Sequence, residues 1–489
     1  MAKPKLWLGL STVGILVTTL LLAGRQLAEV NAGLINDVLG LSTQKIGNID
    51  NADVEGSAYK DANGSLSDKG WKRMIADSYN FCEEAVEQGS VLLKNEVKDG
   101  KPTLPLAKEE RKVTLLGRGS KNLFMRSGAG GAAPNPNLKV TLDKAFKNNG
   151  FQINEEVYKA YSTLSLSNMT SPSTTVESYS EINKDALKQT FAQYGDAAII
   201  TFVRIGTENT DPSDGKLNIN SDEINLLKMV KEFKDNGSFK KVIVLINSPL
   251  PMSMDWVDKE EYGIDALVYV GVPGYYGAGG IAHVLAGEKP HLYYDEGQEK
   301  LVPQKNNDGS TVMEVVNPSG HLPDTFAASA SSSAAYQNFG NNQVVVYKEG
   351  VYVGYKYYET RYEDAVLGQG NASGVKGKYN SVSNWNYAEE MGYPFGFGLS
   401  YGTFEQKLTE VKYNASDDTI EAKVSVKNNG ELNGKASVQL YVQQPFTQFD
   451  KDNGLGRPSI ALMTYDKVEV PAKGSKDVTL QFDRYFLAT

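Results

Sequence analysis

The sequence predicts an α/β domain built on a mostly parallel sheet, followed by an all-β sandwich of the immunoglobulin or fibronectin type. Runs rich in Val and Ile, such as AAIITFV and KKVIVLINS, alternate with helical patterns in the first part of the chain. Strands that are buried on both faces and separated by helices are typical of a parallel sheet. Near residue 404 the pattern changes to alternating apolar and polar residues, which is typical of sandwich strands.

The composition is that of a folded, acidic protein. The chain has 489 residues, and 40% of them are apolar, which is enough for packed cores in two or three domains. Its 50 Lys and Arg residues against 59 Asp and Glu residues give a net charge of -9. Nucleic acid is therefore not expected as a partner, because phosphate binding needs a basic face. The single cysteine, Cys82, excludes an intrachain disulfide, and three histidines without zinc-type spacing predict no metal site.

The N-terminal region is predicted to be a membrane anchor. The uncharged run LWLGLSTVGILVTTLLLAG, residues 6–24, follows two lysines and precedes Arg25. As a helix it would measure about 28 Å at 1.5 Å per residue, close to the thickness of the hydrocarbon layer. The lysines place the N-terminus inside and the remaining chain outside the cell. We expect a signal anchor in residues 1–32 and a polar stalk in residues 33–70, with signal cleavage after Ala32 and secretion as the alternative.

Residues 71–403 are expected to form the α/β domain. MIADSYNFCEEAVEQ is an amphipathic helix pattern that runs into an apolar strand, KVTLLGRGS is a strand that ends in glycine, and LKVTLDKAFKNNG is a helix with a glycine stop. AAIITFV, KKVIVLINS and IDALVYVGVPG are further strands of the buried type. Ligands of such sheets gather at the carboxyl ends of the strands. At such an end, AAIITFV opens into the acidic loop RIGTENTDPSDG, residues 204–215.

Residues 404–489 are expected to form an incomplete sandwich. TIEAKVSVKNNGELNGKASVQLYVQQP alternates on both sides of an Asn-Gly turn, ALMTYDKVEVPAKGSKDVTLQF continues the alternation, and neither stretch fits a helix. There are about five strand signals, whereas a complete sandwich of this kind has about seven. Unpaired edges are therefore expected in this domain, and unpaired edges favour association.

Four segments, in this order along the chain, resemble signatures of the family 3 glycoside hydrolases, the β-glucosidase and β-xylosidase group. They are QGSVLLKNE followed by LPL, NPSGHLPDTF, YKEGVYVGYKYYET and YPFGFGLSYGTF. The stretch VKNNGELNGKASVQLYV resembles the fibronectin type III-like domain that follows in the family. The resemblance covers roughly residues 75–489. It implies a hydrolase of O-glycosyl bonds, above all a retaining β-glucosidase that acts on β-linked oligosaccharides or glycosides and needs no cofactor.

The resemblance also implies a missing part. The family's catalytic body is a TIM-like barrel that carries the nucleophilic aspartate, and no barrel pattern precedes the α/β domain here. Some members have the reversed order, with the barrel last, and this chain resembles the front of such a protein. It is then expected to need a barrel in cis or in trans and to be inactive alone. Asp255, in MDWV, resembles the nucleophile motif only superficially, and HLYYDEGQEKLVPQKNNDGSTVMEVV is expected to be a surface insertion.

The loop RIGTENTD resembles the R-x-x-G-E-G-x-D loop that the family's α/β domain lends to the sugar site. The resemblance implies that Glu208 is the general acid/base, although Thr207 and Asn209 replace the two glycines that normally flank it. A retaining glycosidase needs such a carboxylic acid opposite a carboxylate nucleophile. The acid must stay protonated near neutral pH, so its pKa must be raised by burial or by a neighbouring negative charge.

The resemblance also suggests three substrate-binding residues. Arg204 and Asp211 belong to the acidic loop, where either could hold it through hydrogen bonds, and Tyr275 belongs to the glycine-rich turn GVPGYYGAGG. Without the resemblance, Glu208, Asp211 and Asp214 could equally be solvated turn residues. A calcium loop does not fit, because the EF-hand pattern needs glycine at its sixth position and glutamate at its twelfth. A non-catalytic, membrane-anchored module that binds carbohydrate or serves as a scaffold is the alternative from another class.

Overall fold

The computed structural model describes most of the chain after residue 67. The chain divides into two units, Met1–Trp71 and Lys72–Thr489. The short described pieces of the first unit between residues 13 and 25 are helical. No helix in the described part of the chain is both long and apolar enough to cross a bilayer; most of the predicted anchor lies outside the described residues. The described residues are 13–14, 17–21, 24–25, 68–125, 139–165, 176–206, 214–338, 343–344, 346–347, 349–368, 371 and 385–488.

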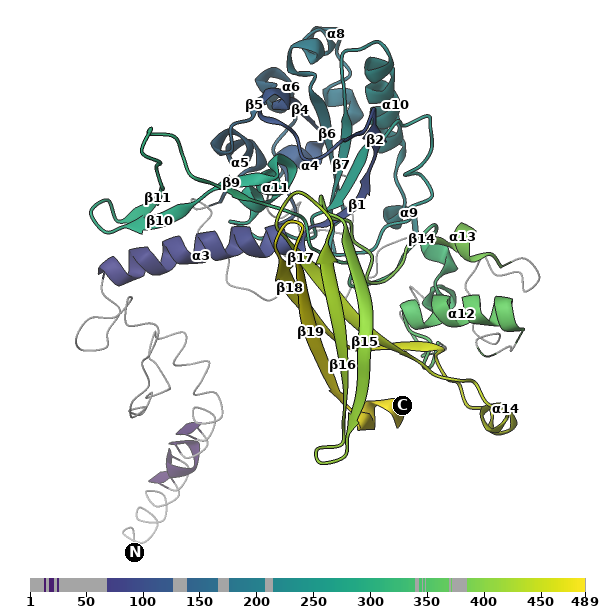
Figure 1. Ribbon diagram of the computed structural model, residues 1–489. Helices are drawn as coiled ribbons and strands as arrows, with labels where there is room; N and C mark the ends of the chain where they lie inside the picture. The colour runs from purple at the N-terminus through teal and green to yellow at the C-terminus, as the bar shows by residue number, and fades with distance from the viewer. Residues whose placement is uncertain are drawn as a thin grey trace, which may run out of the picture. The chain divides into compact units, whose positions relative to one another are not determined.

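A six-stranded sheet in the order β1-β8-β7-β6-β4-β5 forms the α/β domain (Figure 1). Five strands pair in parallel, and β1 pairs antiparallel with β8 at one edge. Every residue of β6 and β7 is buried, as expected for a sheet covered on both faces. The predicted fold class is thereby confirmed. The strands are β1 (Val91–Asn95), β4 (Lys112–Leu116), β5 (Gln152–Ile153), β6 (Ala197–Val203), β7 (Val242–Asn247) and β8 (Ala266–Tyr269).

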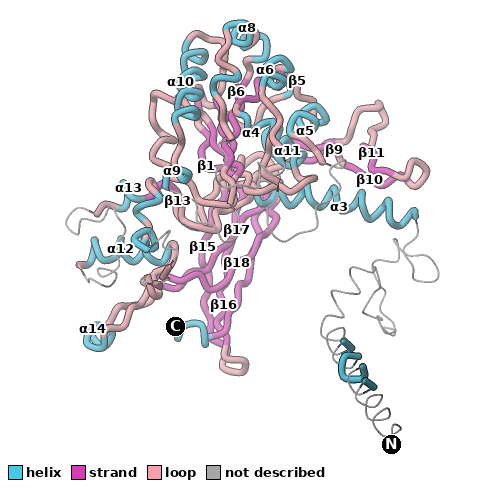
Figure 2. The backbone as a smooth tube through the Cα atoms, turned by 180° about the vertical axis from the view of Figure 1, so that it is seen from behind, coloured by secondary structure: helices cyan, strands magenta, loops and turns pink. Residues whose placement is uncertain are grey.

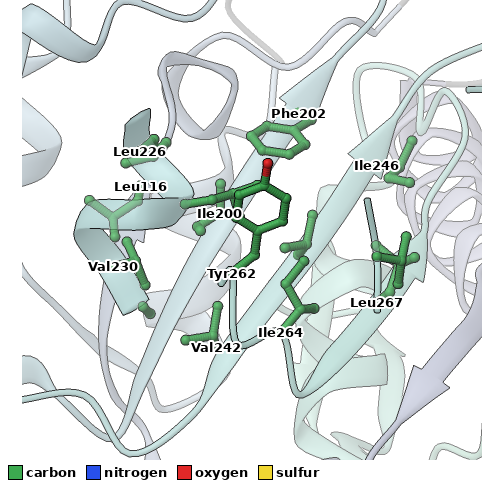
Figure 3. Close-up of a cluster of buried hydrophobic side chains, with 14 of the residues drawn as sticks. Leu116, Ile200, Phe202, Leu226, Val230, Val242, Ile246, Tyr262, Ile264 and Leu267 are labelled. Carbon is green, nitrogen blue, oxygen red and sulfur yellow. The ribbon is translucent and has the colours of Figure 1, made fainter. Parts of the chain in front are cut away.

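Helices cover both faces of this sheet. Alternate residues of β6 point to opposite sides, so that Ile200 joins one apolar core and Ile199 the other. The first core packs against α10 through Leu226 and Val230 (Figure 3), and the second packs against α5 and α11. The described helices of this part are α3 (Asp68–Gly89), α4 (Arg118–Lys121), α5 (Leu142–Asn148), α6 (Glu155–Ala160), α8 (Asp185–Lys188), α9 (Asp214–Leu217), α10 (Ser221–Asp235), α11 (Ala278–Ala286), α12 (Tyr355–Leu367) and α13 (Tyr387–Glu390).

The predicted insertion forms short antiparallel ladders outside the main sheet. Strand β9 pairs with β12, and the hairpin β10–β11 extends from them. Ion pairs of Arg73 with Glu296 and of Lys72 with Glu299 connect the hairpin to α3. The short strands of the domain are β2 (Val97–Lys98), β3 (Lys101–Pro102), β9 (Glu288–Pro290), β10 (Leu292–Asp295), β11 (Lys300–Pro303), β12 (Met313–Val315), β13 (Phe326–Ala327) and β14 (Met391–Tyr393).

In the described part of the chain, five antiparallel strands form the sandwich; Figure 2 labels β15, β16, β17 and β18 among its magenta strands. One sheet has the order β15-β16-β19 and the other pairs β17 with β18. Val, Leu and Ala side chains from both sheets, such as Val426 and Val438, meet in a separate core. The short helix α14 (Gln448–Asn453) lies between the two alternating stretches of the sequence. The strands are β15 (Phe404–Asn414), β16 (Thr419–Asn428), β17 (Gly434–Gln443), β18 (Ile460–Val470) and β19 (Ser475–Asp483).

Two of the family signatures pack against each other at the end of the α/β domain. The Asn317 carboxamide oxygen accepts hydrogen bonds from the Ser400 hydroxyl at 2.6 Å and from the Tyr401 backbone N–H at 2.8 Å. A Cβ atom on Gly398 would lie only 2.1 Å from the carbonyl oxygen of Gly320, and one on Gly320 would lie 2.3 Å from the carbonyl oxygen of Ser90, so each glycine permits a close backbone approach. The NPSGHLP and YPFGFGLSY segments are therefore explained by packing against each other next to the sandwich, where the Asn317 amide nitrogen donates to the Asn433 carbonyl oxygen at 3.3 Å.

Candidate functional site

The candidate site lies at the carboxyl ends of β4, β6 and β7, where the acidic loop leaves the sheet. Residues 207–213 of that loop, which include Glu208 and Asp211, lie outside the described residues. Asp214 begins α9. The structure therefore describes the two segments that flank the loop: the end of β6 on one side and the start of α10 on the other.

Arg204 holds the two ends of the loop together. Its Nη1 donates to Glu223 Oε1 at 2.7 Å and its Nη2 donates to Glu223 Oε2 at 2.8 Å. The same guanidinium donates to the carbonyl oxygens of Val203, at 2.9 Å, and Asn218, at 2.7 Å. Both charged side chains are buried, and that of Glu223 is only 2% exposed. A buried bidentate pair of this kind is rigid, so residues 203 and 218 are fixed relative to each other.

Glu223 has a second function as part of the cap of α10. Its backbone N–H donates to the Asn220 side-chain oxygen at 2.9 Å, while its own carboxylate accepts from the Asn220 backbone N–H at 2.9 Å. This reciprocal arrangement is a capping box. The sequence analysis missed Glu223, although the segment NSDE, with Asn and Glu three residues apart, carries the signal of such a cap.

A further buried acid, Glu177, lies beside this arrangement. Its Oε2 accepts a hydrogen bond from the Arg118 backbone N–H at 2.7 Å, and its Oε1 has no partner among the described residues. Burial, reinforced by the negative charge of Glu223, raises the pKa of Glu177 to about 8. The Glu177 carboxyl group is therefore protonated at a higher pH than an ordinary glutamate. No pattern in the sequence distinguished it from the other surface-type glutamates of its segment.

Asn247, the last residue of β7, connects the neighbouring strand ends. Its amide nitrogen donates to the carbonyl oxygens of Phe124, at 3.0 Å, and Gly271, at 2.7 Å. Its side-chain oxygen accepts from the Phe124 backbone N–H at 2.7 Å, and its backbone carbonyl accepts from Arg204 N–H at 3.1 Å. The side chain is fully buried. Asn247 thus connects, through hydrogen bonds, the segment after α4, the end of β6 and the turn that leads to Tyr275.

The glycine-rich turn places its two tyrosines differently. Tyr275 is buried, and its carbonyl oxygen accepts from the Val140 N–H at 2.9 Å. The Tyr276 ring packs on the Tyr79 ring of α3 with 4.2 Å between centroids. Nothing in these contacts shows a sugar-facing wall, so substrate binding by Tyr275 stays a prediction. The same holds for substrate binding by Arg204, whose described contacts are all with the protein.

Asp255 shows no feature of a nucleophile. It lies in a turn and not in a helix. Its carboxylate is largely exposed and lies 3.6 Å from the Lys259 ammonium. The neighbouring Trp256 is buried in the core, with its ring 5.7 Å from that of Phe202. The MDWV segment is therefore a turn that the buried Trp256 side chain anchors in the apolar core.

The fold defines a class of protein in which a mixed, mostly parallel sheet domain is joined to an antiparallel sandwich. Residues 90–355 match the Glycosyl hydrolase family 3 C-terminal domain. The chain therefore belongs to this family, as the sequence signatures predicted.

Known relatives and solved structures agree with this assignment. The chain is 32% identical to the thermostable β-glucosidase B of Acetivibrio thermocellus, over 55% of this chain and 27% of that protein. It is 28% identical to a β-glucosidase of Ruminococcus albus, over 82% of this chain and 36% of that protein. The structure resembles a β-glucosidase from Paenibacillus barengoltzii with a TM-score of 0.62 and 25% identity, over 83% of this chain and 38% of that one. β-Glucosidase 3B from Thermotoga neapolitana gives a TM-score of 0.57 and 25% identity, over 82% and 48%. The chain spans less than half the length of each of these proteins.

Proposed function

We propose that this chain supplies the acid/base part of a retaining glycoside hydrolase of the β-glucosidase type. The observation that carries the proposal is the buried Arg204–Glu223 pair, which fixes both ends of the loop that contains Glu208. A general acid on a surface loop must be held within a fraction of an ångström of its substrate oxygen. Membership of the family and the names of the relatives support the same function.

In the proposed reaction, Glu208 protonates the leaving oxygen of a β-linked oligosaccharide or glycoside. An aspartate on a barrel domain, in cis or in trans, attacks the anomeric carbon, and the two carboxyl groups lie about 5–5.5 Å apart in retaining enzymes. Contact with that second domain would bury Glu208 and raise its pKa. Asp211 is proposed to contact the sugar or to hold the loop that contains Glu208, and Tyr275 is proposed to contact the sugar. Arg204 is proposed to act mainly by holding that loop in place. No cofactor is needed for this chemistry.

The chain alone is expected not to hydrolyse aryl β-glucosides above the buffer rate, because a general acid without a nucleophile lacks half of the retaining mechanism. Mixing or fusing the chain with the barrel domain of a family 3 relative is expected to produce hydrolysis. The absorbance of the released phenol measures hydrolysis by the chain alone and by its combination with a barrel domain. If every such combination stayed inactive while still binding sugar, the alternative of a carbohydrate-binding or scaffold module would be favoured instead.

We propose further that the chain functions outside the cytoplasm, held at the membrane by residues 6–24. The support is the apolar length of this run and the two lysines before it. After expression, the full chain is expected in the membrane fraction and should be released by detergent but not by salt. A soluble product that begins near Gly33 would show signal cleavage and secretion instead.

A further inference from the structure

Strand β15 is an edge strand of the sandwich in the described part of the chain. Within the described part of the chain it pairs only with β16, and its other edge carries no strand. The nine residues between its two ends are all exposed, so that neither face of the strand is covered. A long edge strand with free backbone N–H and C=O groups is a template for pairing with another strand.

One face of β15 is apolar except for Gln406, whose amide nitrogen donates to the Ser437 carbonyl oxygen of β17. Leu408, Val411 and Tyr413 are 54%, 61% and 50% exposed, although they lie opposite Val424, Ala422 and Ile420 of β16. Those partners point into the sandwich, where Val424 and Ala422 are buried. The three β15 side chains therefore belong to the inner face of the sheet, and the two-stranded sheet β17–β18 does not reach them.

The other face of β15 carries charges of alternating sign: Glu405, Lys407, Glu410 and Lys412. A bulge between Leu408 and Glu410 brings all four onto one face, because their partners on β16 are residues 427, 425, 423 and 421, which follow the strand at every second position. Without the bulge, the first two charges and the last two would point to opposite faces. The bulge therefore creates a continuous charged stripe.

This stripe is complementary to itself. We propose that two copies of the chain pair antiparallel along β15, about a two-fold axis between Leu408 and Thr409. Glu405 then faces Lys412 of the second copy and Lys407 faces Glu410 of the second copy, and each pair occurs twice by symmetry. Such an isologous contact closes on itself and forms a dimer. On the inner face, Phe404 lies opposite Tyr413 of the second copy and Gln406 opposite Val411.

The charges also exclude the neighbouring registers. A slip of two residues in one direction would place Glu405 opposite Glu410, and a slip in the other direction would place Lys407 opposite Lys412. Like charges directly opposite each other destabilise a strand pair. A slip of one residue would place the charged face of one copy beside the apolar face of the other. Charged residues usually protect an edge from pairing, but here they favour one arrangement, in which the partner is a second copy of this chain.

The test is the oligomeric state of the full chain and its charge-reversed variants, released with detergent and measured by sedimentation equilibrium in low salt. The chain is expected to form a dimer that weakens as salt is added. Lys412→Glu and Glu405→Lys should each raise the dimer dissociation constant by about tenfold or more, because each reverses two symmetry-related cross-strand pairs. The double variant Glu405→Lys/Lys412→Glu restores opposite charges and should return the constant to near that of the unchanged chain.

Asp477→Lys is the matched control. Asp477 lies on β19, at the opposite edge of the same sheet, and on the same outer face, because it pairs with Ser425. Its reversal should leave the dissociation constant unchanged, and circular dichroism should show that all variants remain folded. A chain that stays monomeric at its highest soluble concentration would overturn the proposal. So would single variants that dimerise as well as the unchanged chain, or a double variant no better than the singles.

Discussion

Glu223→Gln is expected to lower the free energy of unfolding of the α/β domain by about 3–5 kcal/mol, the usual effect of removing one charge from a buried ion pair. Glutamine has the same shape and can still accept the Asn220 N–H, so the cap of α10 is preserved. What is lost is the charge that balances Arg204, whose guanidinium would remain buried with a neutral partner. Urea unfolding followed by circular dichroism measures the change, because α10 and α11 are among the helices that dominate this signal.

A second ion pair on the same helix provides the control. Lys231 and Asp235 are one turn apart on α10 with their charged atoms 2.5 Å apart, but both are partly or largely exposed. Asp235→Ala should therefore cost less than about 1 kcal/mol. If Glu223→Gln cost no more than this exposed control, the pair with Arg204 would not be what fixes the ends of the loop.

Arg204→Lys distinguishes geometry from charge at the same position. Lysine keeps the positive charge but lacks the planar fork that bonds both Glu223 oxygens together with the carbonyls of Val203 and Asn218. We expect it to lie between the unchanged chain and Glu223→Gln in stability. It should also increase amide hydrogen exchange at residues 203–206 and 218–220, because the two ends of the loop would then separate more easily.

The fold could be predicted because its main elements have strong local patterns. β6 and β7 are short apolar runs bounded by turns, and β16 to β19 alternate apolar and polar residues with a period of two. The sequence of each strand therefore indicates directly which of its residues are buried. Elements whose form depends on distant partners were missed. The two-residue strand β5 is defined by its pairing with β4. The ladder β10–β11 lies inside a polar insertion without clear alternation, and the ladder β9–β12 pairs residues just before that insertion with residues near its end.

The site was predictable only in part, for a similar reason. Arg204 and the acidic loop stood out because they follow a buried strand and resemble a family motif. Glu223 and Glu177 did not, because each becomes unusual only when the fold buries it beside a group far away in the sequence: Arg204 in one case and the Arg118 N–H in the other. The pKa of about 8 for Glu177 results from its burial in the folded protein. The sequence around a single glutamate does not show whether the fold will bury it.

Glu208→Ala, in the enzyme formed with the barrel, is expected to slow hydrolysis of glucosides with poor leaving groups by about 10²–10⁴-fold, the usual contribution of general acid catalysis. Alkyl glucosides and disaccharides should lose most, because their leaving oxygen must be protonated in the transition state. Glucosides of acidic phenols should lose less in the first step, since the phenolate leaves without a proton. Initial rates across a series of leaving groups of increasing pKa should therefore show a steeper dependence in the variant than in the unchanged enzyme.

With acidic phenol leaving groups, the second step should become limiting in this variant. The glycosyl-enzyme formed with the barrel aspartate would accumulate, because water attacks it only slowly without Glu208 as general base. A burst of phenol release should precede the steady state. Added azide should accelerate turnover, since it attacks the anomeric carbon without giving up a proton, and β-glucosyl azide should form with the configuration of the substrate retained. The unchanged enzyme should show little acceleration.

Asp214→Ala is the matched control, because it removes another carboxylate from the same acidic segment at the start of α9. It should leave the rate, the leaving-group dependence and the response to azide within a few-fold of the unchanged enzyme. Unfolding of the variants in urea must remain the same as that of the unchanged enzyme, so that lost activity cannot be attributed to lost structure. A Glu208→Ala enzyme that retains its rate on poor leaving groups, or that shows no response to azide, would place the general acid elsewhere and leave the loop between Arg204 and Glu223 without a catalytic role.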